Sequence, residues 1–111
     1  RSAPPPPFWG ETSSWLAAQG GGYAVDLRSL YSRWDAPPDL RVVYDFMAPP
    51  EETRAYLERA GTRWVVLDRT LPVAETALDP ADGSRSFLGW PLCFRAEAPV
   101  NPLSVYGRAC P

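Results

Sequence analysis

The stretch PPEETRAYLERAGTRWVVLD, residues 49–68, decides the fold that we expect for this chain. Its two prolines and two glutamates are typical of a helix start, where proline loses no hydrogen bond and carboxylates face the positive end of the helix dipole. Small or apolar side chains then recur at helical spacing, at Thr53, Tyr56, Leu57 and Ala60. We expect Arg54 and Glu58 to pair on the outer face and Gly61 to end the helix. Residues 63–68 follow as an apolar run typical of a buried strand.

The same alternation of helix and strand occurs upstream. Residues 11–19 predict a short helix with Thr or Ser as its N-cap, and the glycines at 20–22 end it. Residues 23–27 and 41–46 are apolar runs typical of strands, and 29–34 between them permit one or two helical turns. Connections of about 14 to 16 residues between these strands favour parallel crossovers. Apolar runs without strict alternation fit a parallel sheet that is covered on both faces.

The pattern changes after the third strand. Residues 70–83 are rich in turn formers, with at most one brief helix at 73–78. Residues 92–98 and 103–109 predict two further strands, and 99–102 predict the hairpin loop between them. We therefore expect a small three-layer α/β domain, in which a three-stranded parallel sheet is extended by a C-terminal antiparallel hairpin.

This hairpin also places the two cysteines opposite one another. The expected register pairs Glu97 with Tyr106, Arg95 with Arg108, and Cys93 with Cys110. A disulfide there closes a loop of about 18 residues and contributes about 3 kcal/mol in the chain-entropy model. The alternative is two unrelated buried thiols. Because disulfides persist outside the cytoplasm, the pairing favours an extracytoplasmic compartment.

Composition narrows the classes of function. The 111 residues suffice for one domain, which we place at 10–111 behind a proline-rich tether at 1–9. A net charge of −2 leaves no surplus of cations for phosphates, so we expect no nucleic-acid partner. The chain has no His and only two Cys, which excludes His-based catalysis and a tetrahedral thiolate zinc site, and we expect no cofactor. No initiator Met and no uncharged apolar stretch of about 20 residues occur, and we expect a segment of a longer protein.

Three aspartates, Asp26, Asp45 and Asp68, lie near the ends of the three predicted parallel strands. The carboxyl ends of such strands share one edge of the sheet, where ligands of open α/β sheets bind. Clustered carboxylates there would form a Mg²⁺ pocket. Against this hypothesis, the chain has no Lys and no Asp-x-Asp pair. The alternative interpretation is that the three aspartates are turn or cap residues.

Five tryptophans make the chain rich in aromatic surface. Trp15 and Trp64 lie inside a predicted helix and a predicted strand, and we assign them to the core. Trp9, Trp34 and Trp90 neighbour turns rich in Pro and Gly, and we expect them to contact a partner, a sugar or an interfacial membrane layer.

The order of these segments resembles a known family. The segments that carry the resemblance are Trp15-Leu16, YAVDL at 23–27, Leu30-Tyr31, AYLERAG at 55–61, TRWVVLD at 62–68 and SVYGR at 104–108. Over residues 11–109 they resemble the extracytoplasmic C-terminal domain that follows the membrane helices in many bacterial polytopic glycosyltransferases. That family uses lipid-linked sugars, and its catalytic carboxylates lie in loops between the membrane helices. No position of this chain matches those catalytic motifs.

The resemblance implies a non-catalytic domain on the extracytoplasmic face of the bacterial cell membrane, in a glycosyltransferase or a related envelope protein. Its expected partners are the membrane-spanning part of its own parent chain and a lipid-linked sugar or glycan acceptor. Two alternatives stay open. One is an independent Mg²⁺-binding α/β domain that uses Asp26, Asp45 and Asp68, and the other is a secreted sugar-binding module.

Overall fold

A computed structural model describes residues 8–20, 22–33, 41–96 and 100–111. It contains two α-helices, α1 (Trp9–Gln19) and α2 (Pro50–Ala60). The six strands are β1 (Tyr23–Asp26), β2 (Arg41–Tyr44), β3 (Trp64–Asp68), β4 (Ser86–Phe87), β5 (Trp90–Phe94) and β6 (Leu103–Gly107). Short 3₁₀ helices, η1 and η3, occupy Leu30–Arg33 and Pro80–Asp82.

The strands form one mixed sheet in the order β2-β1-β3-β6-β5-β4. β1 runs parallel to both β2 and β3, as the crossover lengths predict. β6 then pairs antiparallel with β3, and β5 and β4 follow antiparallel. The expected α/β class is therefore confirmed, but the detailed description holds only in part. The C-terminal hairpin joins the sheet through its second strand, β6, and β4 is an additional strand that the sequence pattern does not predict.

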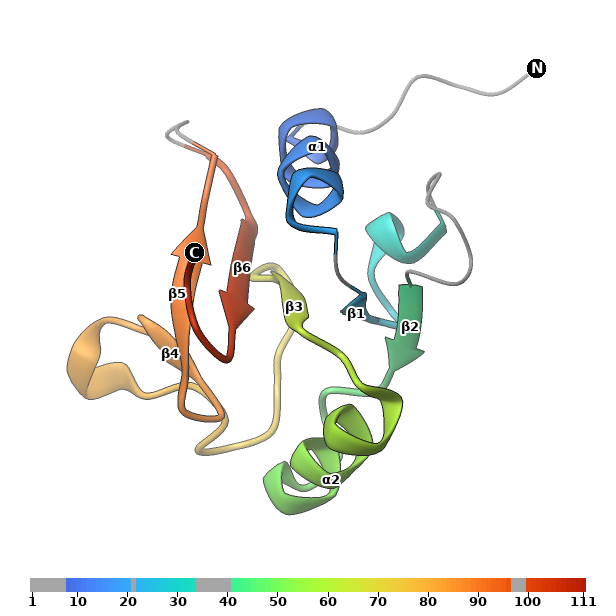
Figure 1. Ribbon diagram of the computed structural model, residues 1–111. Helices are drawn as coiled ribbons and strands as arrows, with labels where there is room; N and C mark the ends of the chain where they lie inside the picture. The colour runs from blue at the N-terminus through green and yellow to red at the C-terminus, as the bar shows by residue number, and fades with distance from the viewer. Residues whose placement is uncertain (1–7, 21, 34–40, 97–99) are drawn as a thin grey trace.

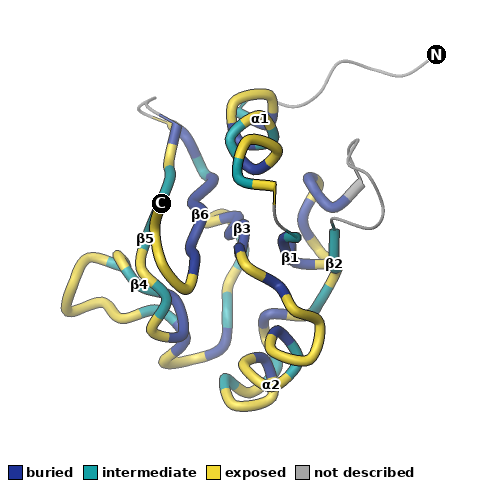
Figure 2. The backbone as a smooth tube through the Cα atoms, viewed as in Figure 1, coloured by how far each residue is buried: buried dark blue, intermediate teal, exposed yellow. Residues whose placement is uncertain are grey.

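Helices cover both faces of this sheet. α1 supplies Trp9 and Leu16 to a buried cluster on one face, and α2 supplies Leu57 to a second cluster on the other. Figure 1 shows the two helices on opposite sides of the central strands, and Figure 2 shows those strands as the buried centre of the chain. Every residue of β1, β3 and β6 is buried. Burial on both faces explains why these strands are apolar runs without alternation.

Helix α1 begins earlier than the sequence pattern predicts. Phe8 precedes it with φ 74°, and no side chain caps it, so the expected Thr or Ser cap is wrong. The reason is the indole of Trp9, whose ring centroid lies 6.1 Å from that of Tyr23 and 5.6 Å from that of Tyr31. Because this ring packs in the core, residue 9 belongs to helix α1 and not to the expected tether. Residues 1–7, the remainder of that tether apart from Phe8, lie outside the described residues.

Helix α2 matches its prediction, with Pro49 before it and Gly61 at φ 68° after it. The expected pairing of Arg54 with Glu58 is wrong, since the one ion pair among the described residues joins Arg28 and Asp26. Downstream of β3, turns replace the brief helix expected at 73–78. Hydrophobic side chains of that stretch pack against the core instead, which favours an irregular path over a helix.

The disulfide between Cys93 and Cys110 is confirmed, with a Cα–Cα distance of 5.1 Å. The register that predicted it is wrong. Leu92 faces Tyr106 and Phe94 faces Val105, with an irregularity between them at Cys93. Cys110 lies beyond the end of β6, and its Sγ is 3.5 Å from the Leu92 carbonyl oxygen. The disulfide thus fastens the returning C-terminal tail to β5 rather than bridging two paired strand positions. Glu97 lies outside the described residues.

Gly107 ends β6 beside the buried indole of Trp64. It faces Trp64 across the β3–β6 ladder. A Cβ atom at residue 107 would lie 2.2 Å from Cζ3 of Trp64 and 3.3 Å from Sγ of Cys93. The buried indole crosses the backbone here, so there is no space for any side chain.

We expect Gly107→Ala to lower the free energy of unfolding by about 1–3 kcal/mol, because the new methyl group displaces a packed indole ring. Urea unfolding followed by tryptophan fluorescence measures this loss. Gly10→Ala is the matched control, since a Cβ there meets nothing within 4 Å. Equal stability of the two variants would contradict the close approach of Trp64 and Gly107.

Candidate functional site

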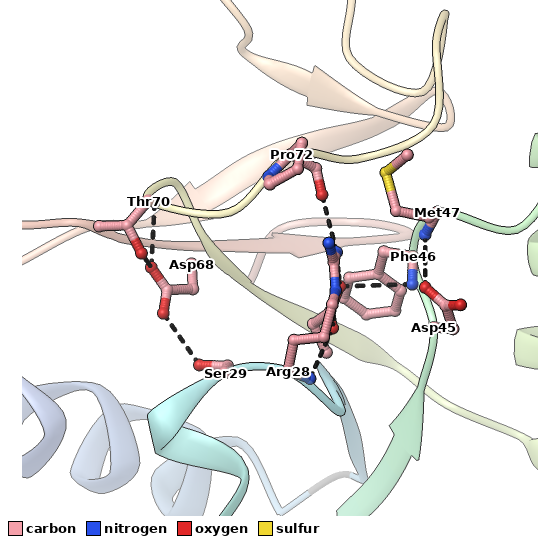
Figure 3. A network of polar contacts seen from close by, with 9 residues as sticks. Arg28, Ser29, Asp45, Phe46, Met47, Asp68, Thr70 and Pro72 are labelled. Atoms are coloured by element: carbon pink, nitrogen blue, oxygen red, sulfur yellow. Dashed lines mark hydrogen bonds and ion pairs between the residues drawn. The ribbon is translucent and has the colours of Figure 1, made fainter.

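The carboxyl edge of the three parallel strands is the candidate functional site. Asp26 ends β1, Asp68 ends β3, and Asp45 directly follows β2, so the three aspartates lie along one edge as expected. Figure 3 shows Asp45 and Asp68 with their partners from the neighbouring loops. What these carboxylates can do depends on which groups already occupy their oxygen atoms.

Asp26 is buried and fully engaged. Its Oδ1 accepts hydrogen bonds from Nε of Arg28 at 2.9 Å and from the Arg28 backbone N–H at 2.8 Å. Its Oδ2 forms an ion pair with Nη2 of Arg28 and accepts a bond from the Phe46 N–H at 3.3 Å. Burial by itself raises the pKa of Asp26, but the hydrogen bonds and charge of Arg28 and the Phe46 N–H outweigh it, so the pKa lies below 3.8. Asp26 is therefore a structural anion.

Arg28 extends this contact to the next loop. Its Nη2 also donates to the Pro72 carbonyl oxygen at 2.7 Å, which ties the end of β1 to the chain after β3 (Figure 3). The hydrogen bonds to Asp26 raise the pKa of Arg28 above its ordinary value, against the smaller opposing effect of burial. One guanidinium group thus links the loops that follow two neighbouring strands.

Asp68 and Asp45 accept hydrogen bonds from residues of the loops around them. Asp68 accepts hydrogen bonds from Ser29 Oγ at 3.0 Å and from the hydroxyl and backbone N–H of Thr70 at 2.6 and 3.0 Å. Asp45 is exposed and accepts the Met47 N–H at 2.9 Å. Residues 8–20, 22–33, 41–96 and 100–111 hold no group of three acidic or sulfur side chains placed to bind a metal ion. The described residues therefore do not assemble the expected Mg²⁺ pocket. Each of the three carboxylates accepts the N–H two residues ahead, as the alternative interpretation of turn aspartates predicts.

A surface pocket of about 310 Å³ lies beside this edge. Its lining residues are Arg28, Leu30, Tyr31, Asp68, Thr70, Leu71 and Pro102. Burial, and then the charge of Asp68, raise the pKa of Tyr31 above 10.0, so its hydroxyl keeps its proton at neutral pH. Asp68 is hydrogen-bonded on both oxygens, so in this pocket it holds the neighbouring loops together beside the exposed side chain of Leu30.

Sequence reasoning missed Arg28, Ser29 and Thr70, which complete this edge. The signal that could have found two of them is local. Asp26 and Asp68 are each followed two residues later by a side chain that donates back, Arg28 and Thr70. Ser29 has no such signal, because its hydroxyl meets Asp68 across 39 residues of sequence.

Of the three tryptophans expected at a contact surface, the structure describes Trp9 and Trp90. Trp9 is 3% exposed, so its assignment to a partner or sugar site is wrong, for the packing reason given above. Trp34 lies outside the described residues. Trp90 is half-buried in β5, and the guanidinium of Arg108 lies 4.9 Å from its ring centre. Trp15 and Trp64 pack edge to face at 4.9 Å, as core residues do.

Comparisons of the chain with models of protein families, with curated proteins and with solved structures give no match. Among the described residues, neither helix has the length and the apolar character needed to cross a bilayer.

We expect Asp26→Asn to lower the free energy of unfolding at neutral pH by about 2 kcal/mol, because Arg28 loses its anionic partner. The lowered pKa of Asp26 stabilises the wild type above pH 3.8, and this contribution is lost as the pH falls through the folded-state value. The two proteins should therefore converge in acid. Urea unfolding at a series of pH values measures the difference, and a constant gap would contradict it. Asp45→Asn is the control, since Asp45 is exposed, its side-chain hydrogen bond stays within its own turn, and its charge acts on Arg28 less strongly than that of Asp26 does.

We also expect millimolar Mg²⁺ or Mn²⁺ to leave the thermal unfolding midpoint unchanged. An ion that binds the native state raises this midpoint by mass action. Here both carboxylate oxygens of Asp26 and of Asp68 already accept hydrogen bonds. Asp45 lies in a separate turn, where it accepts the Met47 N–H. Differential scanning calorimetry provides the measurement, and a saturable rise that Asp68→Asn abolishes would contradict the expectation.

Proposed function

We propose that this chain is a non-catalytic extracytoplasmic domain of a membrane-embedded glycosyltransferase or a related bacterial cell-envelope protein. In this proposal the domain positions an acceptor or a partner over the membrane-embedded active site. The observation that carries it is the Cys93–Cys110 disulfide, because such bonds are rare in the reducing cytoplasm and persist outside it.

The non-catalytic role is supported by the state of the carboxyl edge. Enzymes with open α/β sheets bind substrate in the crevice beyond this edge. Here Asp26 and Asp68 accept hydrogen bonds from Arg28, Ser29 and Thr70, so both carboxylates are part of the contacts that hold the loops of this edge together. The chain also has no His to replace them. A binding role therefore fits this edge better than proton transfer.

The glycosyltransferase origin is supported by the order of elements. The helix with Trp15-Leu16, the strand 23–27, and the helix and strand at 55–68 occur in the sequence order typical of that family. The proposed partners are the membrane-spanning part of the parent chain and a lipid-linked sugar or glycan acceptor. Leu27, Leu30 and Met47 are about half exposed on the loops of the carboxyl edge, which supplies an apolar surface for such contacts.

The experiment that tests the proposal begins with the gene that encodes residues 1–111. We expect its product to carry several membrane helices ahead of this domain. In intact cells whose outer layers are permeabilised, protease added from outside should cleave the domain from the membrane-bound remainder. Thiol titration of the recovered domain should find no reactive thiol, and its intact mass should be lower by two hydrogens than that of the reduced chain.

A cytoplasmic protein of the same cells, which stays protected from the protease, is the control for cell integrity. A gene product without membrane helices would end the glycosyltransferase proposal. Two reactive thiols in the native protein, together with protection from external protease, would end the extracytoplasmic part as well.

A further inference from the structure

A second pocket, of about 380 Å³, lies between helix α2 and the loop that leads to β4 and β5. Its lining residues are Arg54, Thr76, Ala77, Leu78, Asp79, Pro80, Ser86, Leu88 and Gly89. None of them belongs to the carboxyl edge described above. We propose that this pocket binds a small organic monocarboxylate, with Arg54 as the group that holds the carboxylate. The proposal is independent of the domain's place in a membrane protein.

Arg54 is the one cation among the described residues that line this pocket. Its Nε donates to the Leu88 carbonyl oxygen at 3.4 Å, which directs the side chain from α2 toward the loop. Within the described part of the chain, no carboxylate lies within 4.0 Å of its guanidinium group, although Glu58 is one helical turn away. The remaining N–H donors of the guanidinium fork match the two oxygens of a carboxylate.

The loop that Arg54 contacts, which carries Thr76 and Leu88, is held in a fixed conformation by its own contacts. Thr76 and Leu88 hold φ values of 71° and 56°, which non-glycine residues adopt only where surrounding contacts impose them. The Leu88 N–H donates to the Ala77 carbonyl oxygen at 2.7 Å, and both residues are buried. This hydrogen bond joins the two ends of the segment 77–88, which includes η3 and β4. A preformed loop lowers the ordering cost of binding a small molecule.

The other lining residues define the class of ligand. Leu78, which is partly exposed, offers apolar surface beside the charge of Arg54, and the buried Ala77 and Leu88 form the floor behind it, which suits a short aliphatic group next to a carboxylate. Asp79 lines the same pocket, and its negative charge disfavours phosphate and dicarboxylates, which carry a second negative charge. A volume near the lower end of ligand pockets limits the ligand to a small molecule. A branched monocarboxylate meets all three conditions.

Titration of the ¹⁵N-labelled chain with isovalerate, followed by two-dimensional NMR, tests the proposal. We expect saturable shifts at the amides of residues 76–79 and 86–89 and at Nε of Arg54. Isovaleramide, which has the same aliphatic group without the charge, should bind about tenfold more weakly or not at all, because it loses the charge-assisted hydrogen bonds.

Arg54→Gln should weaken isovalerate binding by the same factor, since glutamine preserves the helix but removes the cation. Arg59→Gln, on the exposed last turn of the same helix, is the matched control and should bind as the wild type does. The spectra themselves report whether each variant is folded. Absence of saturable shifts with the wild type, or equal binding by Arg54→Gln, would overturn the site. Phosphate binding as tightly as isovalerate would overturn the ligand class.

Discussion

Strand β3 is hydrogen-bonded along both edges and buried on both faces, and the rest of the structure is arranged around it. It pairs with β1 in parallel and with β6 antiparallel, so it joins the parallel half of the sheet to the antiparallel half. Its side chains alternate between the two clusters under α1 and α2. Because the N–H and C=O groups of a buried strand must all be paired, β6 is required beside β3 once the helices cover both faces. The hairpin is therefore part of the core rather than an appendage.

This central strand also determines how the carboxyl edge is used. Both β1 and β3 end in a buried aspartate, Asp26 and Asp68, and a buried anion is stable only with donors around it. Arg28, Ser29 and Thr70 supply those donors from the loops that leave the strands. The arrangement fastens the loops to the sheet, and it holds both buried carboxylates, Asp26 and Asp68, in structural hydrogen bonds. The same residues that indicated a metal pocket thus stabilise the edge itself.

At the other end of the hairpin, one disulfide and one glycine close the fold. The correct pairing of Cys93 with Cys110 came from an incorrect register, because the β-ladder is offset and the tail after Gly107 turns back toward β5. The irregularity at Cys93 and the crossing of Trp64 over Gly107 depend on packing between strands that are distant in sequence. A register predicted from sequence is obtained by counting residues outward from the expected turn, and this count cannot reveal a shift in strand pairing such as the one at Cys93. The two cysteines are close enough to bond in spite of the wrong register, but the residue pairs predicted between the strands are wrong.

We could derive three features from the order of residues alone: the α/β class, helix α2 with its proline start and Gly61 end, and the three parallel strands. Helical spacing and long apolar runs are local signals, which is why these features were predictable. The absence of His from the sequence also excludes His-based catalysis. Three other features became visible only in the folded chain: Trp9 begins α1, Arg54 points toward Leu88 rather than Glu58, and Ser29 contacts Asp68. Each of these depends on a partner far away in the chain, and the energy of such a contact is settled by packing in three dimensions rather than by the residues on either side.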